Sequence, residues 1–329
     1  LSGRAGIWVT SREAQDAPWG EPVDLGPNVN SGGESYPAIS PDELELYFHP
    51  AYNSSDLMRS TRASKDEPWG PATRYTDLGD ARYLDFAPDG LTVYFSSRRP
   101  GGYGGVDIWT ATRTTVDAPW GEPVNLGPNI NADGGQYGPS ISNDGLVLCF
   151  YWDFRIRMAR RATKDDAWGP AVELGPSVNG HGWVIEPEIS PDGSVLYFDS
   201  NANRPGGFAG ENFWQVSIIP IVDFDGDGRT DLVDLLMLID NWGSDDTLYD
   251  IGPMPWGDGV VDAADLEVLL SYWDELDDPP FLAPWKRDET EDIFAFDRAA
   301  ENHGIVFGES RTLGPMVNTE NTEFGPNIS

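Results

Sequence analysis

The fold is decided by the stretch from Pro88 to Ser140. It reads Pro-Asp-Gly-Leu-Thr-Val-Tyr-Phe-Ser-Ser from Pro88, Arg-Pro-Gly-Gly-Tyr-Gly-Gly from Arg99, Asp-Ile-Trp-Thr-Ala-Thr-Arg from Asp107, Pro-Trp-Gly-Glu-Pro-Val-Asn-Leu-Gly-Pro from Pro119 and Tyr-Gly-Pro-Ser up to Ser140. Most of the remaining chain is a copy of this stretch or an interruption of it.

The copies follow one another at a fixed spacing of about 50 residues, which is the mark of a repeat architecture. The Trp-Gly pair occurs at Trp19, Trp69, Trp120 and Trp168, and a Leu-Gly pair follows each of them. A Ser-Pro-Asp or Pro-Asp-Gly turn with a Tyr-Phe strand returns in step with these pairs.

Within one unit, apolar and polar residues alternate over short runs, as in Leu91-Val93-Phe95, and Gly, Pro, Asn and Asp bound each run. The alternation predicts strands, about four per unit. The turn sequences supply the φ angles that tight turns require, so successive strands are expected to pair antiparallel. A unit of this size with four strands is typical of one blade of a β-propeller.

Residue for residue, the units resemble the β-propeller repeats of TolB-type bacterial proteins, over residues 1–220 and 292–329. The resemblance implies a mainly β fold of four-stranded antiparallel blades, about 5–6 of them in the intact protein. It implies no particular function, because propellers host binding, scaffolding and catalysis alike.

The blades are expected in chain order. Residues 1–35 supply the outer half of one blade, residues 36–80, 82–130 and 136–178 form three fuller blades, and residues 183–219 begin another. Both ends of the chain fall inside a unit, which indicates a fragment of a longer protein. Residues 322–329 are therefore candidates to complete the half-blade at the N-terminus.

After residue 220 the apolar period changes from two residues to 3.6, which predicts a small helical module over residues 221–276. One helical stripe contains Leu232, Leu235, Leu236, Ile239 and Trp242, and another contains Leu266, Leu269, Leu270 and Trp273. A Pro- and acid-rich connector over residues 277–291 follows, and a truncated propeller-like repeat resumes over residues 292–329. The module is either an insertion in one propeller or a linker between two.

The first half of the module contains a calcium-binding loop pattern. Loop positions 1, 3, 5, 9 and 12 are all aspartate, Gly228 occupies position 6, where the chain must turn sharply, and position 7 offers a backbone carbonyl. This is the EF-hand ligand set with Asp in place of Glu at position 12. The predicted Ca²⁺ ligands are Asp223, Asp225, Asp227, Arg229 through its carbonyl, Asp231 and Asp234.

The second half repeats the pattern less completely. Asp258, Val260 through its carbonyl, Asp262 and Asp265 keep positions 5, 7, 9 and 12, but positions 1 and 3 fall on Met254 and Trp256. An enlarged loop could recruit Asp250 instead. The equal spacing of corresponding residues in the two halves indicates one motif that has been duplicated.

A duplicated Asp-rich loop, each copy followed by a single helix, resembles the dockerin type I module. The resemblance implies folding on Ca²⁺ and docking onto a cohesin-type protein partner through loop positions 10 and 11 and the adjacent helix. Those positions are the apolar pairs Leu232-Val233 and Ala263-Ala264. The alternative is a calcium-stabilised structural insert with no docking role.

Composition narrows the choice of partners. The net charge of −34 opposes binding to nucleic acid or to an anionic bilayer surface and favours a cationic partner or a metal ion. Acidity that merely keeps a secreted protein soluble is the alternative. No apolar run is long enough to span a membrane.

The single cysteine, Cys149, lies in an apolar strand and is expected in the core.

No catalytic residues are predicted. The three histidines have no metal-ligand spacing, no Gly-x-Ser-x-Gly elbow occurs, and the glycine-rich run from Arg99 to Gly105 is expected to be a hairpin loop. Paired carboxylates for glycoside hydrolysis are compatible with so acidic a chain. The repeated Trp residues are expected to pack within the blades.

These observations favour an extracellular or cell-surface, non-catalytic propeller that acts in binding or assembly through a calcium-dependent module, although no signal peptide is visible. Two alternatives stay open. One is a carbohydrate-active hydrolase, or an accessory domain with a carbohydrate ligand, in polysaccharide degradation. The other is a cell-envelope scaffold.

Overall fold

The computed structural model describes residues 6–14, 17–52, 54–180, 182–201, 212–220, 222–225, 229–246, 248–253, 257–273, 305–307 and 311–312. Four antiparallel sheets dominate this part of the chain. The first contains β3 (Ser35–Ile39), β4 (Glu45–His49), β5 (Leu57–Thr61) and β6 (Thr73–Tyr75). The second contains β7 (Arg82–Phe86), β8 (Thr92–Ser97), β9 (Asp107–Thr112) and β10 (Val124–Asn125).

The third sheet contains β11 (Gln136–Ile141), β12 (Val147–Trp152), β13 (Arg155–Arg160) and β14 (Val172–Glu173), which the short helix α1 (Pro176–Asn179) follows. The fourth contains β15 (Val184–Ile189), β16 (Val195–Ser200), β17 (Asn212–Pro220), β18 (Ile305–Phe307) and β19 (Arg311–Thr312). A two-stranded sheet of β1 (Trp8–Val9) and β2 (Val23–Asp24) precedes them.

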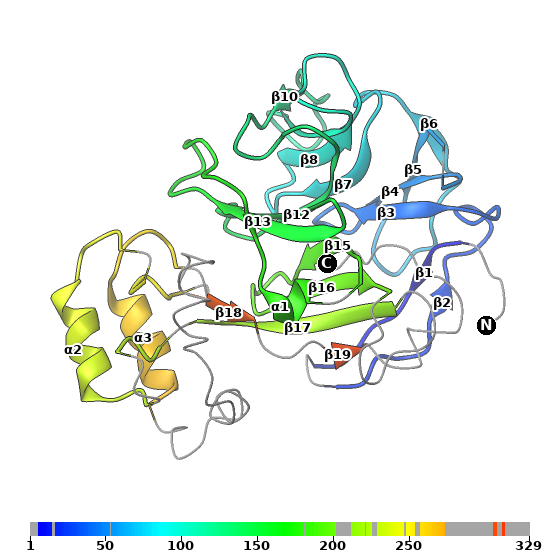
Figure 1. The fold of residues 1–329 in the computed structure, drawn as a ribbon. Helices are drawn as coiled ribbons and strands as arrows, with labels where there is room; N and C mark the ends of the chain where they lie inside the picture. Colours follow the sequence, from blue (N-terminus) through cyan, green and yellow to red (C-terminus); the bar gives the residue numbers. More distant parts are fainter. Residues whose placement is uncertain are drawn as a thin grey trace.

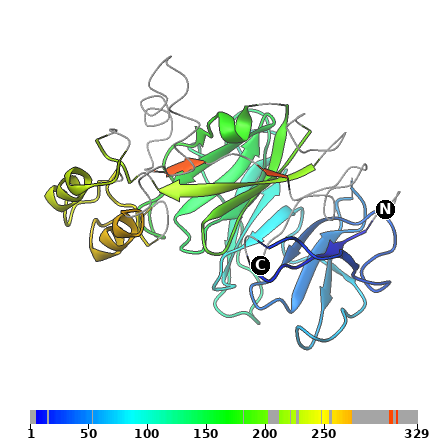
Figure 2. The ribbon, with the colours of Figure 1, turned by 90° about the horizontal axis from the view of Figure 1, so that it is seen from below.

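The sheets are arranged radially (Figure 1). Their first strands contact one another in turn, β3 with β7, β7 with β11 and β11 with β15. The view from below shows the sheets following one another around the molecule (Figure 2). The predicted mainly β fold of antiparallel blades in a β-propeller is confirmed.

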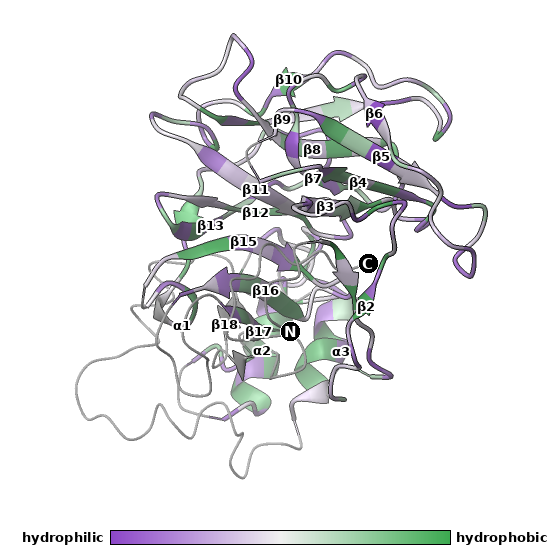
Figure 3. Cartoon of the chain, turned by 90° about the vertical axis from the view of Figure 1, so that its right-hand side faces the viewer, coloured by the Kyte–Doolittle hydropathy of each residue, from purple (hydrophilic) through white to green (hydrophobic). Residues whose placement is uncertain are grey.

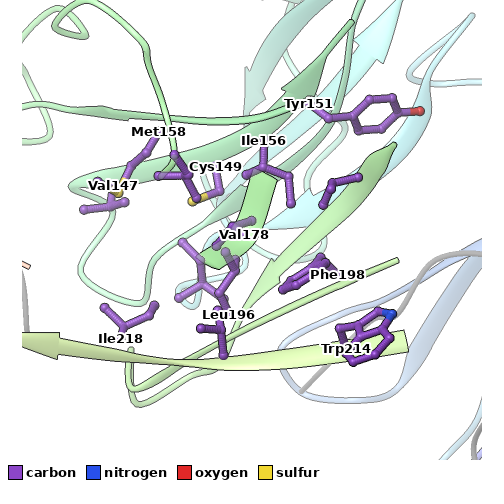
Figure 4. Close-up of a cluster of buried hydrophobic side chains, with 14 residues drawn as sticks. Val147, Cys149, Tyr151, Ile156, Met158, Val178, Leu196, Phe198, Trp214 and Ile218 are labelled. Carbon is purple, nitrogen blue, oxygen red and sulfur yellow. The ribbon is translucent and has the colours of Figure 1, made fainter. Parts of the chain in front are cut away.

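Apolar side chains from neighbouring sheets fill the space between them. The cluster between the third and fourth sheets includes Val147, Met158, Leu196, Phe198 and Trp214 (Figure 4). Cys149 lies in the same cluster as a buried free thiol, so its prediction as a core residue is confirmed. Comparable clusters join the first sheet to the second and the second to the third.

The Trp residues of the repeat pack within the blades. Trp69, Trp120 and Trp168 are buried in three different clusters, which confirms their predicted packing role. An arginine guanidinium lies over each indole ring, 4.3 Å from the centroid for Arg113 over Trp120. Such cation–π contacts contribute about 0.5–2 kcal/mol each, depending on burial.

In the first, third and fourth sheets, the turn between the first two strands is held by a short side-chain network. The Ser142 hydroxyl lies 2.5 Å from a carboxylate oxygen of Asp144, which also accepts a hydrogen bond from the Leu146 amide at 2.8 Å. The glycine-rich run from residue 99 to 105 lies in the connection between β8 and β9, which pair antiparallel, so its prediction as a hairpin loop is confirmed.

The helical module is inserted into the fourth sheet. β17 precedes the module in the chain, β18 and β19 follow it, and both pair antiparallel with β17. The segments on either side of the module therefore belong to one sheet, which selects the insertion from the two arrangements left open by the sequence. The expected pairing of residues 322–329 lies outside the described residues, as do the connector over 277–291 and the start of the resumed repeat.

The module has two halves, with helices α2 (Leu232–Asp240) and α3 (Ala263–Ser271) in contact. Val222, Phe224, Leu238, Ile251 and Leu269 form its buried core. Figure 3 shows hydrophobic segments on both helices as well as on the strands of the sheets. No helix in the described part of the chain is long and apolar enough to cross a membrane.

Candidate functional site

The first loop of the module gathers three aspartates. The side chains of Asp223, Asp225 and Asp234 each offer a carboxylate oxygen, and these oxygens lie within 4.8 Å of one another. Asp223 and Asp234 are buried and Asp225 is exposed. Carboxylate oxygens are the ligands that Ca²⁺ prefers, and three of them at this separation repel one another without a cation.

Backbone amides fix the geometry of this loop. Asp234 accepts hydrogen bonds from the amides of Phe224 and Asp231, both at 2.7 Å. Asp231 in turn caps α2 by accepting from the Val233 amide at 2.8 Å. Burial raises the pKa of Asp234, while these amide donors act in the opposite direction.

The predicted ligand set of the first loop is only partly within the described residues. Asp231 occupies the N-cap position of α2, and Arg229 lies just before it. Asp227 lies outside the described residues. The structure therefore brings together the predicted ligands at positions 1, 3 and 12.

The second loop repeats this hydrogen-bond pattern. Asp265 accepts from the amides of Ile251 and Gly252 and, through its other oxygen, from Asp262, as Asp234 does from Phe224, Asp225 and Asp231. Asp262 caps α3 by accepting from the Ala264 amide. These matches make Asp250 the counterpart of Asp223, the first ligand.

Asp250 occupies the centre of the second loop. Its carboxylate accepts hydrogen bonds from the amides of Asp258 and Gly259, each at 2.8 Å. Burial raises the pKa of Asp250 to about 6. The exposed Val260 follows these residues, while Met254 and Trp256 lie outside the described residues.

The first helical stripe expected from the sequence is largely exposed. Leu235 packs against the module core, but Leu232, Leu236, Ile239 and Trp242 are between 48 and 59 % exposed. Val233 is also exposed. The core side of α2 is instead formed by Leu238 with Leu235 and Met237, because the core lies toward α3. α2 thus presents an apolar face to solvent.

A tyrosine cluster lies where the innermost strands of the sheets meet. The ring centroids of Tyr36 and Tyr83 are 4.2 Å apart, those of Tyr83 and Tyr137 are 6.0 Å apart, and Tyr137 stacks on Tyr151 at 5.3 Å. Burial, followed by Tyr151 and then Glu186, raises the pKa of Tyr83. The Tyr83 phenol is therefore neutral at physiological pH.

The backbone of this cluster is held in an uncommon conformation. Tyr36, Tyr83 and Glu186 have φ angles of 53°, 52° and 53°, and each lies at a β-bulge of an innermost strand. Bulges re-aim side chains, and left-handed backbone at bulky residues is concentrated at functional sites.

The tyrosine cluster was missed from the sequence, although one signal was available. Gly138 occupies the same position in its unit as Tyr36, Tyr83 and Glu186, with a φ of 57°. A glycine at one copy of a repeated position indicates that every copy has left-handed backbone.

Comparisons with known proteins find similar chains among solved structures alone. No family model and no curated protein matches the chain. Among solved structures, the chain is similar to a candidate TolB from Agrobacterium tumefaciens, at 21 % identity and a TM-score of 0.39, over 60 % of this chain and 62 % of that one. It is similar to TolB from Acinetobacter baumannii at 13 % identity and a TM-score of 0.37, over 60 % of this chain and 43 % of that one.

A third similar structure is an exo-1,5-α-L-arabinanase from a bovine ruminal metagenomic library, at 12 % identity and a TM-score of 0.38, over 56 % of this chain and 70 % of that one. The chain thus spans less than two thirds of the two TolB chains. The propeller assignment rests on the sheets themselves, and the dockerin-like docking receives no support from these comparisons.

Proposed function

We propose that this chain is a calcium-binding β-propeller protein whose inserted module is ordered by Ca²⁺ in the loop from Asp223 to Asp234. The observation that carries the proposal is the convergence of the Asp223, Asp225 and Asp234 carboxylates within 4.8 Å. Asp227 and the carbonyl of Arg229 complete the ligand set by their loop positions. The ion supplies the positive charge that offsets three carboxylates at such close range.

The ordered module acts as a docking unit for a protein partner. The exposed apolar face of α2, formed by Leu232, Leu236, Ile239 and Trp242, is the surface we assign to the partner. Leu232 and Val233 occupy the loop positions at which the dockerin-like resemblance places docking. A cohesin-type partner and an extracellular or cell-surface location go with this proposal.

Calorimetric titration of the chelator-treated chain with CaCl₂ tests the calcium site. Saturable binding is expected in the unaltered chain, and Asp225→Asn is expected to weaken it at least about tenfold, because one charged ligand is lost. Asp240→Asn, at the exposed end of α2, is the matched control and binds as the unaltered chain does. Equal binding by the Asp225 variant, or none by the unaltered chain, contradicts the proposal.

A second candidate function is ligand binding at the tyrosine cluster. The left-handed backbone at Tyr36, Tyr83 and Glu186 favours it, because such backbone is concentrated at functional sites. Neutral phenols beside a carboxylate suit the hydroxyl groups of a carbohydrate. A screen against plant and algal polysaccharides tests it: sustained release of reducing ends indicates a hydrolase, and retention of the protein on a polysaccharide without release indicates a binding protein. Loss of retention in Glu186→Gln would locate that binding at the cluster.

A further inference from the structure

We propose that the second loop of the module takes the guanidinium group of Arg160, from the propeller strand β13, in place of a calcium ion, and that this contact holds the module on the third sheet. The inference rests on the proposed calcium function of the first loop and restricts that function to one ion.

The second loop lacks the ligands of the first. Gly252 occupies the place of Asp225, and a Cβ atom there would lie 2.6 Å from the backbone oxygen of Ala264. A carboxylate therefore cannot be placed at this position without moving the start of α3. Within the described residues, the acids of this loop do not form a group of converging oxygens such as Asp223, Asp225 and Asp234 form.

The loop nevertheless encloses a negative charge. Asp250 is completely buried, and two amides donate to its carboxylate. The backbone folds so closely over it that a Cβ atom on Gly257 would lie 2.1 Å from Asp250 Oδ1. A buried carboxylate is costly unless a cation or further donors compensate it.

Arg160 supplies that cation from the propeller. Its Nη2 atom lies 4.0 Å from Asp250 Oδ2, and its side chain is only 12 % exposed. Asp144, in the turn before β12, also acts electrostatically on Arg160, so one acid of the propeller and one of the module act on the guanidinium. Burial lowers the pKa of Arg160, whereas Asp250 and then Asp144 oppose this effect.

A backbone contact places the loop at the same spot. A Cβ atom on Gly259 would lie 3.6 Å from the backbone oxygen of Ala162, two residues beyond Arg160. The module lies beside the edge of the propeller at which β13 and β18 are found (Figure 1). The second loop therefore faces the propeller, and its charged centre faces Arg160.

The number of calcium ions is the first test. Titration of the full chain with CaCl₂ is expected to give one site per chain, weakened at least about tenfold in Asp225→Asn and unchanged in Asp250→Asn. Two sites, one of which disappears in Asp250→Asn, would overturn the proposal. No site at all would instead refute the calcium function of the first loop, and the arginine contact is then decided by the second test.

Hydrogen exchange of the Asp258 and Gly259 amides is the second test, performed on the full chain in saturating CaCl₂. Arg160→Met is expected to speed their exchange by about tenfold or more, because the Asp250 carboxylate that holds them loses its cation. Arg157→Met, on the same strand and paired with Glu173 at 3.4 Å, is the control and leaves both amides as protected as before. Unchanged protection in Arg160→Met would overturn the proposal.

A double variant keeps the test decisive where Arg160→Met itself folds poorly. In an Asp250→Asn background the buried charge is absent, so Arg160→Met is expected to lower the melting temperature by less than half as much as in the unaltered chain. Equal reductions in the two backgrounds would show that Arg160 acts without Asp250 and would also overturn the proposal.

Discussion

One residue position joins two of the blades to the next. Asp85 occupies it in the second sheet and Ser140 in the third, whereas Ala38, which has no acceptor side chain, occupies it in the first. An oxygen of Asp85 accepts from the Ile141 amide at 2.6 Å, and the Ser140 hydroxyl accepts from the Ile189 amide at 2.9 Å. The repeat conserves an acceptor at this position in both units, although the residue type differs.

Asp85 makes the stability of the propeller depend on pH. Burial raises its pKa to about 7 from the ordinary 3.8, against two amide donors. A carboxyl group whose pKa is raised on folding stabilises the folded state fully below pH 3.8, and this contribution is lost as the pH rises through about 7. The full loss corresponds to at most about 4 kcal/mol.

Asp85→Asn is expected to remove this dependence while keeping an acceptor for the amides. Urea unfolding at pH 5 and pH 8 measures it: the unaltered chain loses a few kcal/mol more stability over this interval than the variant does. Parallel pH profiles for the two chains would show that Asp85 is not the responsible group.

At the scale of elements, the strands and helix starts could be predicted from the sequence, because they depend on residues close together in the chain. The alternation Leu91-Val93-Phe95 falls in and beside β8, and the Asp-rich loops each lead into a helix. Asp231 and Asp262, predicted as Ca²⁺ ligands, occupy the N-cap positions of these helices. The tyrosines themselves gave no signal of the bulges at Tyr36 and Tyr83, because tyrosines ordinarily avoid left-handed backbone and the packed sheets impose it; the sequence signalled it through Gly138, at the equivalent position of another unit. Likewise, the side of α2 that is buried depends on where α3 packs.

The two sides of α2 are expected to respond differently to truncation. Leu238→Ala should lower the free energy of unfolding of the module by about 2–4 kcal/mol, because Leu238 is completely buried in its core. Leu236→Ala, two residues away and 51 % exposed, should change it by less than about 0.5 kcal/mol. Thermal unfolding in CaCl₂ measures both, and equal effects would contradict the described orientation of the helix.

At the scale of the whole molecule, a helical module interrupts the propeller within one sheet. The sequence predicted the propeller and the two helices but not their relation, since the pairing of β17 with β18 and β19 joins segments far apart in the chain. The duplicated loop indicated Asp250 as a candidate ligand. Its contact with Arg160 could not be predicted, because Arg160 lies in a distant part of the chain.

The central claim is that Ca²⁺ orders the module while the propeller folds without it. Hydrogen exchange of the full chain, with CaCl₂ and with EDTA, tests it most directly. The account predicts that removal of calcium speeds exchange of the α2 amides by about tenfold or more and leaves β8, β12 and β16 unchanged. Equal protection of α2 in both conditions would contradict it.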